Sequence, residues 1–210
     1  KSKLISKAII ITTTLKRDNK IVKICKKSKI PYFRGNSLNV LKRYYYAAKK
    51  YNLKNIVRIT SDCPLVDPDV IDKICKKYSS KKYHYVSNVL KPTYPDGYDV
   101  EIFNFNTLEK VYRKAKTKFE REHVTTKMIK DKNLKKINIQ LYKNYSNFRF
   151  TLDTISDFNK IKEIFEKEKS IYKPNLKLVL KEALKKGNYY KIKIQNYFWW
   201  KKNLIRVTNY

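Results

Sequence analysis

Two aspartates occupy positions at which metal-dependent chemistry could take place. Asp62 follows the apolar stretch Asn55–Thr60, and Asp153 follows Asn147–Leu152 in the same way. Ligands bind to α/β sheets at the carboxyl ends of the strands, and Mg²⁺ prefers carboxylate, water and phosphate oxygens. Two such carboxylates and a triphosphate could therefore form a site for nucleotide chemistry. The same spacing also fits a second interpretation, in which each aspartate only caps the following helix.

The elements that would position these residues alternate along the first half of the chain. Strands are predicted at Ala8–Ile11, Ile30–Phe33, Asn55–Thr60 and His84–Asn88. Apolar residues three and four positions apart predict helices between them, at Asp18–Ser28, Leu38–Tyr51 and Asp69–Tyr78. Ser37 is the expected N-cap of the second of these helices. Alternation with short connections predicts a mostly parallel sheet covered by helices.

The second half of the chain is less regular. A loop containing prolines and a glycine leads into a strand at Asp99–Phe103, in which Asp99 and Glu101 would point to the same face. The other predicted elements are helices at Asn106–Lys116, Phe119–Lys130, Thr154–Lys167 and Asn175–Lys186, and strands at Lys136–Leu141 and Asn147–Leu152. Residues 1–187 are expected to form one α/β domain, followed by an aromatic and basic tail at 188–210.

The tail contains the adjacent residues Trp199 and Trp200. On a strand these two side chains would face opposite ways, so at least one must find a partner surface or remain exposed. A docked edge strand, an interface between protomers and a connection to a further domain would each fit this pattern.

The chain is strongly basic, with 50 Lys and Arg against 18 Asp and Glu and a formal net charge of +32. The basic residues are nearly all lysines spread along every segment, and with only 3 Gly a general compositional bias explains them. Such a surface attracts polyanions weakly, and no specific nucleic-acid partner is expected. No apolar run approaches the ~18 residues of a membrane span. No secretory signal is found, and a cytoplasmic location is expected.

The three cysteines show no metal-binding spacing. Cys25 and Cys75 are expected to be buried free thiols on apolar helix faces. Cys63 lies beside Asp62 and could be reactive, but no suitably spaced histidine supports it as a nucleophile. An odd number of cysteines without a secretory signal favours a reducing compartment.

Four sequence blocks, in the same order, resemble one enzyme family. They are RGNSLNVLKRYYYAAKKYNLKNIVRITSDCPLVDPDVIDKI, VSNVLKPTYPDGYDVEIFNF, FEREHVT and FRFTLDTISDFNKI. Over roughly Ala8 to Leu184 the chain is similar to the cytidylyltransferase-like proteins of spore-coat polysaccharide biosynthesis, which are relatives of CMP-KDO and acylneuraminate cytidylyltransferases. The resemblance implies an α/β nucleotide-diphospho-sugar transferase fold (GT-A, Rossmann-like), a three-layer sandwich with a mostly parallel mixed sheet.

The same resemblance implies a reaction and a set of site residues. A sugar hydroxyl would attack the α-phosphate of CTP to give a CMP-sugar and pyrophosphate, and a homodimer is conceivable. Asp62 and Asp153 match the positions that hold Mg²⁺ in related enzymes, and Arg58 would act beside Asp62 on the phosphates. The residues expected to bind the nucleotide are Thr13 and Arg34, and those expected to bind the sugar are Asp99, Glu101, Arg121, Glu122 and His123.

Several of these assignments have a purely structural alternative. His123 could simply hydrogen-bond at a helix surface, and Arg121 with Glu122 could be a local helix pair. Asp99 and Glu101 could form a solvated edge face. The Gly/Arg-rich phosphate loop of such enzymes, which should lie before Ala8, is not found in this sequence, and two interpretations stay open: a truncated domain or a degenerate relative. Two rival functions therefore stay open, a glycosyltransferase that uses an activated nucleotide sugar and a non-catalytic binding domain of a larger protein.

Overall fold

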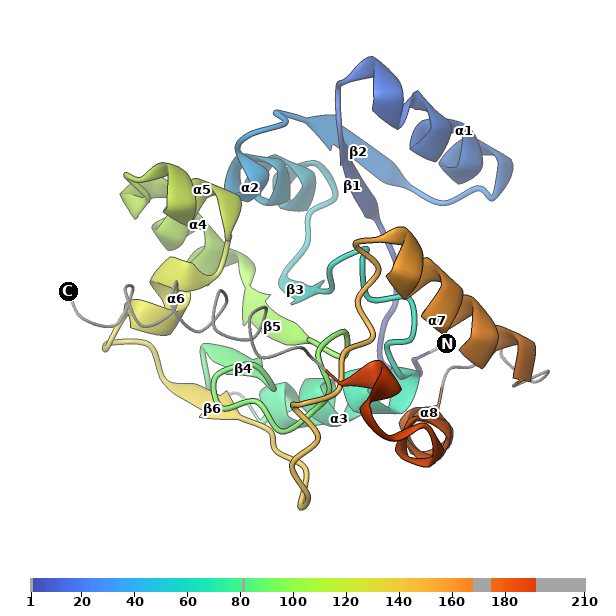
Figure 1. Ribbon diagram of the computed structural model, residues 1–210. Coiled ribbons are helices and arrows are strands. Elements are labelled where there is room, and N and C mark those ends of the chain that lie inside the picture. The colour runs from blue at the N-terminus through green and yellow to red at the C-terminus, as the bar shows by residue number, and fades with distance from the viewer. Residues whose placement is uncertain (1, 81, 168–174, 192–210) are drawn as a thin grey trace. The chain divides into compact units, whose positions relative to one another are not determined.

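A computed structural model describes residues 2–80, 82–167 and 175–191 (Figure 1). The chain forms two compact units. The first contains the N-terminal residues up to Leu4, Val57–Ile102 and the described residues from Lys136 onward, and the second contains Ile5–Ile56 and Phe103–Lys135. The boundary passes through two strands, β3 (Asn55–Arg58) and β5 (Glu101–Asn104).

The second unit contains a two-stranded parallel sheet. Its strands are β1 (Ile10–Thr13) and β2 (Tyr32–Gly35), and Ile10 lies opposite Tyr32. Between them lie a 3₁₀ turn at Lys16–Asp18 and helix α1 (Asn19–Lys27). Helix α2 (Val40–Lys50) packs against both strands and against α4 (Phe105–Lys114) and α5 (Lys118–Glu122). The buried apolar residues of this unit include Val22, Cys25, Leu41, Ala47, Ala48, Leu108 and Val111.

Two helix predictions in this unit were wrong, one in the N-cap residue and one in the continuity of the helix. The N-cap of α2 is Asn39 instead of Ser37, and its side chain accepts a hydrogen bond of 2.8 Å from Lys42 N. The helix predicted at Phe119–Lys130 is divided into α5 and α6 (Thr126–Lys130). The division falls at Val124, whose φ of 33° lies outside the helical region and is unusual for a β-branched residue.

A four-stranded sheet has the strand order β3-β5-β4-β6, in which β4 is Tyr85–Ser87 and β6 is Lys136–Asn138. Strands β4 and β6 pair in parallel with Tyr85 opposite Lys136, and helix α3 (Pro68–Ser79) packs against β4. The predicted α/β class with a mixed sheet is confirmed. None of the helices in the described part of the chain is long and apolar enough to cross a membrane.

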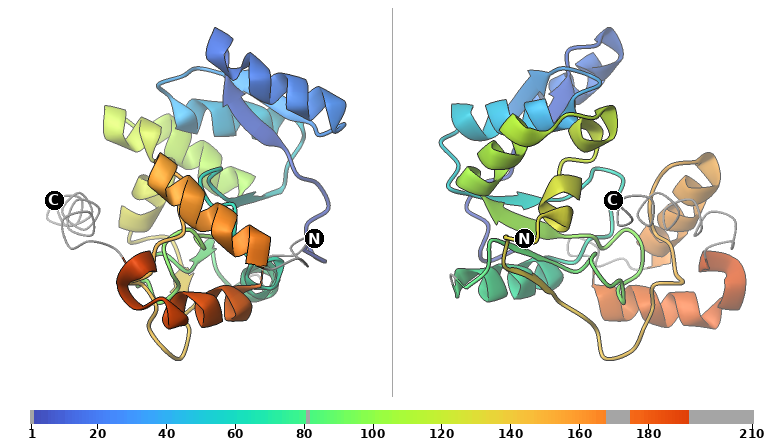
Figure 2. Two further views of the ribbon diagram at one scale, coloured as in Figure 1. Left: turned by 45° about the vertical axis from the view of Figure 1, so that its right-hand side comes forward. Right: turned by 90° about the vertical axis from the view of Figure 1, so that its left-hand side faces the viewer.

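The first unit ends with helices α7 (Ile155–Lys167) and α8 (Leu176–Lys185). These two helices lie near each other in both views of Figure 2, and an ion pair joins Lys186, which follows α8, to Glu163 of α7. The prediction of a strand at Asn147–Leu152 was wrong. Its residues form only isolated bridges, between Asp96 and Arg149 and between Phe148 and Lys191.

The predicted tail at 188–210 begins inside a 3₁₀ turn, Gly187–Tyr190, in which Tyr190 is buried. Trp199 and Trp200 lie outside the described residues. A domain boundary at residue 187 stays a prediction.

Candidate active site

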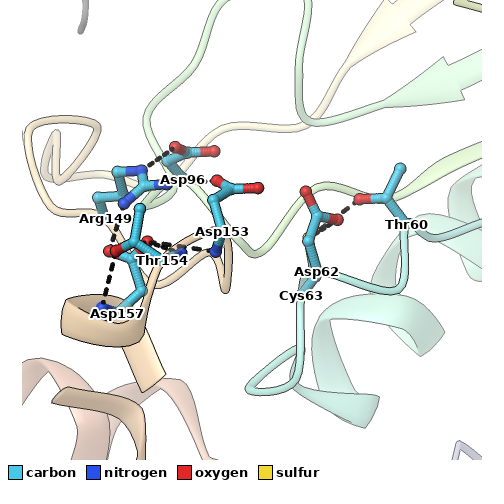
Figure 3. Close-up of polar contacts among 8 residues, drawn as sticks. All are labelled: Thr60, Asp62, Cys63, Asp96, Arg149, Asp153, Thr154 and Asp157. Atoms are coloured by element: carbon cyan, nitrogen blue, oxygen red, sulfur yellow. Dashed lines mark hydrogen bonds and ion pairs between the residues drawn. The ribbon is translucent and has the colours of Figure 1, made fainter. Parts of the chain in front are cut away.

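The two predicted metal ligands lie together in the first unit. The main-chain N–H of Leu152 donates a hydrogen bond of 2.8 Å to the main-chain carbonyl of Asp62, which places Asp153 next to the Asp62 turn. Figure 3 shows both carboxylates extending to the same side of their turns. Their negative charges both act to raise the pKa of the neighbouring Asp96. The two predicted segments therefore lie side by side, although residues 147–152 do not form the predicted strand.

Neither aspartate caps the helix that follows it. The N-cap of α3 is Asp67, whose carboxylate accepts a 2.8 Å hydrogen bond from Asp69 N. At the start of α7 the hydroxyl of Thr154 accepts a 3.2 Å hydrogen bond from Asp157 N. The capping interpretation of Asp62 and Asp153 was therefore wrong, and their carboxylates contact other side chains: the Cys63 thiol lies 3.6 Å from Asp62 Oδ1, and Arg149 bonds to Asp153.

Asp96 is a third acidic residue of the site, and sequence reasoning missed it. Its main-chain carbonyl accepts a 2.8 Å hydrogen bond from Phe150 N, and its main-chain N–H donates a 3.0 Å hydrogen bond to Phe148 O. Gly97 follows with a φ of +96°, and a Cβ there would lie 2.8 Å from main-chain atoms of Phe150. Only glycine suits that conformation and that approach. Burial raises the pKa of Asp96 to about 6, against the opposing charge of Arg149.

Arg149 is the cation among these carboxylates, and it was also missed. Its guanidinium makes ion pairs with Asp96 at 3.6 Å, with Asp157 at 2.5 Å and with Asp153. The Arg149 side chain is 21% exposed, so these pairs are partly shielded from water. Figure 3 shows the four side chains as one connected group.

The start of α7 fixes the main chain next to Asp153. The Asp157 carboxylate accepts from Thr154 N and Thr154 Oγ1, each at 2.9 Å, and from Asp153 N at 3.2 Å. Burial would raise the pKa of Asp157, but the bonds from Thr154 and Arg149 bring it below its ordinary value. Asp157 is therefore a charged anchor, because hydrogen bonds to a carboxylate favour its ionised form.

Arg58 and Glu101 form an ion pair with each other. The Tyr85 hydroxyl donates a 2.5 Å hydrogen bond to the other oxygen of Glu101, whose residue is only 3% exposed. The interpretation of Asp99 and Glu101 as a solvated edge face is therefore wrong for Glu101. Burial raises the pKa of Asp99 to about 8, and the charges of Asp96 and Glu101 add to this effect. The catalytic role of Arg58 and the sugar contacts of the two acids stay predictions.

Cys63 lies beside Asp62 as a buried thiol. Its sulfur is 3.2 Å from Thr60 Oγ1, and burial raises the pKa of the thiol despite that contact. A thiol that stays protonated at neutral pH is a poor nucleophile. Cys25 and Cys75 are also buried and free, as predicted.

The predicted nucleotide residues Thr13 and Arg34 lie together in the second unit. Arg34 Nε donates a 2.8 Å hydrogen bond to the carbonyl of Thr13, and Arg34 Nη2 donates to that of Leu15 at 3.1 Å. The Thr13 hydroxyl donates to Asp18, which also accepts from Thr13 N at 3.1 Å. Arg34 thus stabilises the turn that follows β1, and its role in nucleotide binding stays a prediction.

The remaining predicted sugar residues also belong to the second unit. Arg121 Nη2 donates a 2.9 Å hydrogen bond to the carbonyl of Ala115, while Glu122 is exposed. The ring of His123 lies 4.4 Å from that of Phe119. Arg121 thus links α5 to the end of α4, and His123 packs against Phe119 at the end of α5. Sugar binding by Arg121, Glu122 and His123 stays a prediction.

The acidic residues of this candidate site supply only part of the ligand shell of a magnesium ion. In the described segments no group of three or more His, Cys, Asp or Glu side chains is arranged to hold a metal ion. Asp62 and Asp153 supply the hard oxygen donors that Mg²⁺ prefers, and Mg²⁺ usually completes its shell with water and substrate phosphates. The pair therefore fits an ion bound jointly with a triphosphate.

Comparison with known proteins decides the family. The family model described as Cytidylyltransferase matches residues 1–191. The chain belongs to the cytidylyltransferase family. A solved cytidylyltransferase structure from Leptospira borgpetersenii serovar Hardjo-bovis is similar to it, with a TM-score of 0.83 and 29% sequence identity over 91% of this chain and 82% of that chain. The family resemblance found in the sequence is thus confirmed, and so is the α/β fold with a mixed sheet.

Two curated relatives extend the comparison. An uncharacterized protein of Methanocaldococcus jannaschii is 39% identical over 163 residues, which are 75% of this chain and 65% of that protein. The spore coat polysaccharide biosynthesis protein SpsF of Bacillus subtilis is 27% identical over 165 residues, 76% of this chain and 67% of that protein. The chain therefore spans about two thirds of the length of these relatives.

Proposed function

We propose that this chain belongs to a nucleotidyltransferase that transfers CMP from CTP to a sugar hydroxyl and releases pyrophosphate. Membership in the cytidylyltransferase family supports the cytidine nucleotide. The name of the Bacillus subtilis relative supports a sugar destined for a surface polysaccharide. The observation that carries the proposal is the placement of Asp62 and Asp153 on adjoining turns, joined by the hydrogen bond from Leu152 N to Asp62 O.

Asp62 and Asp153 would bind Mg²⁺ together with the phosphates of CTP. The ion, when bound, supplies positive charge that offsets the charge of the phosphates and of the departing pyrophosphate. Glu101, held by Tyr85, fixes the guanidinium of Arg58, which we assign to the phosphates. No general base needs to be assigned, because positioning and electrostatic stabilisation account for most catalysis of phosphoryl transfer.

We assign the remaining predicted residues to substrate contacts. Thr13 and Arg34 would contact the nucleotide from the turn after β1. The residues that we assign to the sugar are Asp99, Arg121, Glu122 and His123, while Glu101, with both oxygens bonded, acts on Arg58.

The test is release of pyrophosphate by the full natural protein. CTP, UTP, ATP and GTP are each supplied with Mg²⁺ and a panel of sugars, and pyrophosphate is measured over time. We expect release with CTP that requires both the sugar and Mg²⁺. Transfer or hydrolysis of a supplied nucleotide sugar, without pyrophosphate release from any nucleotide, would favour a glycosyltransferase and overturn the proposal.

A further inference from the structure

We infer, on the basis of the proposed function, that Arg149 is a positioning residue that holds the carboxylate of Asp153 in the orientation required for the metal–nucleotide complex. Arg149 itself touches neither the nucleotide nor the sugar in this role. It acts through Asp153, and Asp157 is the anchor that makes the action possible.

The three ion pairs of Arg149 use three different nitrogens. Nε lies 3.6 Å from Asp96, Nη1 lies 2.5 Å from Asp157, and Nη2 bonds Oδ2 of Asp153 (Figure 3). A guanidinium is planar and rigid and presents its donors in a fixed fork. Carboxylates bonded to separate nitrogens of one guanidinium therefore keep fixed positions relative to each other. A lysine ammonium, which is a point charge on a flexible stem, would not impose this order.

Arg149 and Asp157 are both held in place by contacts other than those with Asp153. The Arg149 main chain donates a 2.9 Å hydrogen bond to the carbonyl of Tyr190 and bridges Asp96. The Asp157 side chain is only 10% exposed and is held at the start of α7 by Thr154. Neither Arg149 nor Asp157 can therefore move far without losing several hydrogen bonds.

Asp153 is the least constrained carboxylate of the group. Its side chain is 55% exposed, compared with 39% for Asp96 and 10% for Asp157. The recorded partner of its carboxylate within the described residues is Arg149, bonded through Oδ2. An exposed aspartate without such a bond would sample several rotamers, and ordering it would then cost free energy when the ligand binds. Arg149 removes that cost in advance while Oδ1 stays available for the ion.

Electrostatic effects also require a positive charge at this position. The carboxylates of Asp62, Asp96 and Asp153 lie near one another and carry like charges. Their repulsion is stronger where they are partly shielded from water than it would be in bulk water. The positive charge of Arg149 offsets this repulsion before the cation arrives. A charge effect alone would be restored by lysine, whereas positioning requires the forked bonds of arginine. If Arg149 acts only through its charge, Arg149→Lys should bind the metal–nucleotide complex like wild type. If Arg149 positions Asp153, the same substitution should weaken that binding.

The experiment measures Mn²⁺ binding by electron paramagnetic resonance, with and without CTP and in the absence of sugar. The variants are Asp153→Asn, Arg149→Lys, Asp157→Asn and, as a control, Lys186→Met, which removes an ion pair to Glu163 in the same unit. Loss of a residue that orients a metal ligand typically costs 10–100-fold in affinity. We expect Arg149→Lys to weaken Mn²⁺–CTP binding about tenfold and Asp157→Asn to weaken it to a similar extent. Lys186→Met should bind like wild type.

The outcomes separate this inference from the proposed function. Wild-type Mn²⁺–CTP affinity in Arg149→Lys or in folded Asp157→Asn, with weakened binding in Asp153→Asn, would overturn the positioning role alone. Absence of Mn²⁺–CTP binding in wild type, or unchanged binding in Asp153→Asn, would overturn the metal site and the positioning role with it. Thermal unfolding of each variant confirms that the measured protein is folded, and Asp157→Asn decides the question if Arg149→Lys does not fold.

Discussion

Leu152 donates its main-chain N–H to the main-chain carbonyl of Asp62 over 2.8 Å, and this bond joins the two acidic turns of the site. Both partners are backbone groups, so the contact does not depend on the side chains of the acids. Substitution of Asp62 or Asp153 by a residue of the same shape should therefore leave the turns in place. The loss of function expected from such variants can then be attributed to the missing carboxylate.

Asp67 should contribute strongly to stability without taking part in the chemistry. It is 4% exposed. One carboxylate oxygen accepts a hydrogen bond from Asp69 N and the other accepts one from Leu176 N, each at 2.8 Å. The first bond caps α3 and the second ties the start of α8 to it. Asp67→Ala removes a cap and leaves a buried N–H without a partner, so we expect a loss of about 2–4 kcal/mol in the free energy of unfolding.

Urea denaturation monitored by circular dichroism measures this loss. Asp67→Asn keeps one acceptor oxygen and should lose about half as much. Asp69→Ala alters an exposed residue of the same helix turn and serves as the control, with an expected change of about 0.5 kcal/mol. An Asp67→Ala protein as stable as the control would show that the bond to Leu176 is unimportant.

Glu101 should be required for stability as well as for the position of Arg58. Glu101→Gln removes the negative charge that balances the largely buried Arg58, which should cost about 3–5 kcal/mol. Tyr85→Phe removes only the 2.5 Å bond to Glu101 and should cost about 2 kcal/mol. Because the two residues share one network, the cost of the double variant should be less than the sum.

Chemical denaturation of the single and double variants completes this thermodynamic cycle. Tyr189→Phe, which changes a tyrosine that is 44% exposed, is the control and should lie within about 0.5 kcal/mol of wild type. Strictly additive losses for Tyr85 and Glu101 would show that no such network exists.

The stability of the protein should depend on pH through Asp99. Its pKa in the folded protein is raised from 3.8 to about 8. Between these values the unfolded chain has lost the proton that the folded protein keeps, so stability falls as pH rises from about 4 to 8. Asp99→Asn removes this dependence. The variant should be more stable than wild type at pH 8 by at least about 1 kcal/mol, and the difference should shrink toward pH 4.

Thermal or urea unfolding at a series of pH values measures this effect. Asp69→Asn, on the exposed first turn of α3, should show only a small difference from wild type across the same range. A difference between Asp99→Asn and wild type that does not change with pH would mean that Asp99 is ionised in the folded protein.

Asp62 and Asp153 stood out in the sequence because their signal is local, and the family resemblance paired them. An apolar run, an acid and a helical pattern follow one another directly at Asp62 and at Asp153. Asp96 and Arg149 carry no such signal, since their proximity comes from a bridge between segments distant in the sequence. The dipeptide Asp96-Gly97 was the available indication, because a glycine at a positive φ allows the close approach to Phe150.

The errors at helix ends have a similar physical origin. Serine and asparagine are almost equally good N-caps, so local preference does not distinguish Ser37 from Asn39. The apolar periodicity of residues 119–130 continues across the break at Val124, where tertiary contacts override helix propensity. The segment at 147–152 has the composition of a strand, yet it pairs with its neighbours only at Arg149 and Phe148.

The most direct test of the site is a double-mutant cycle on Asp62 and Asp153. Asp62→Asn and Asp153→Asn should each lower kcat/KM for CTP-dependent pyrophosphate release by about 10²-fold or more. Asp69→Asn should retain the wild-type rate. If both carboxylates serve one ion, the double variant should lose about as much as either single variant. Losses that multiply to about 10⁴-fold, or wild-type turnover in either single variant, would contradict a shared site.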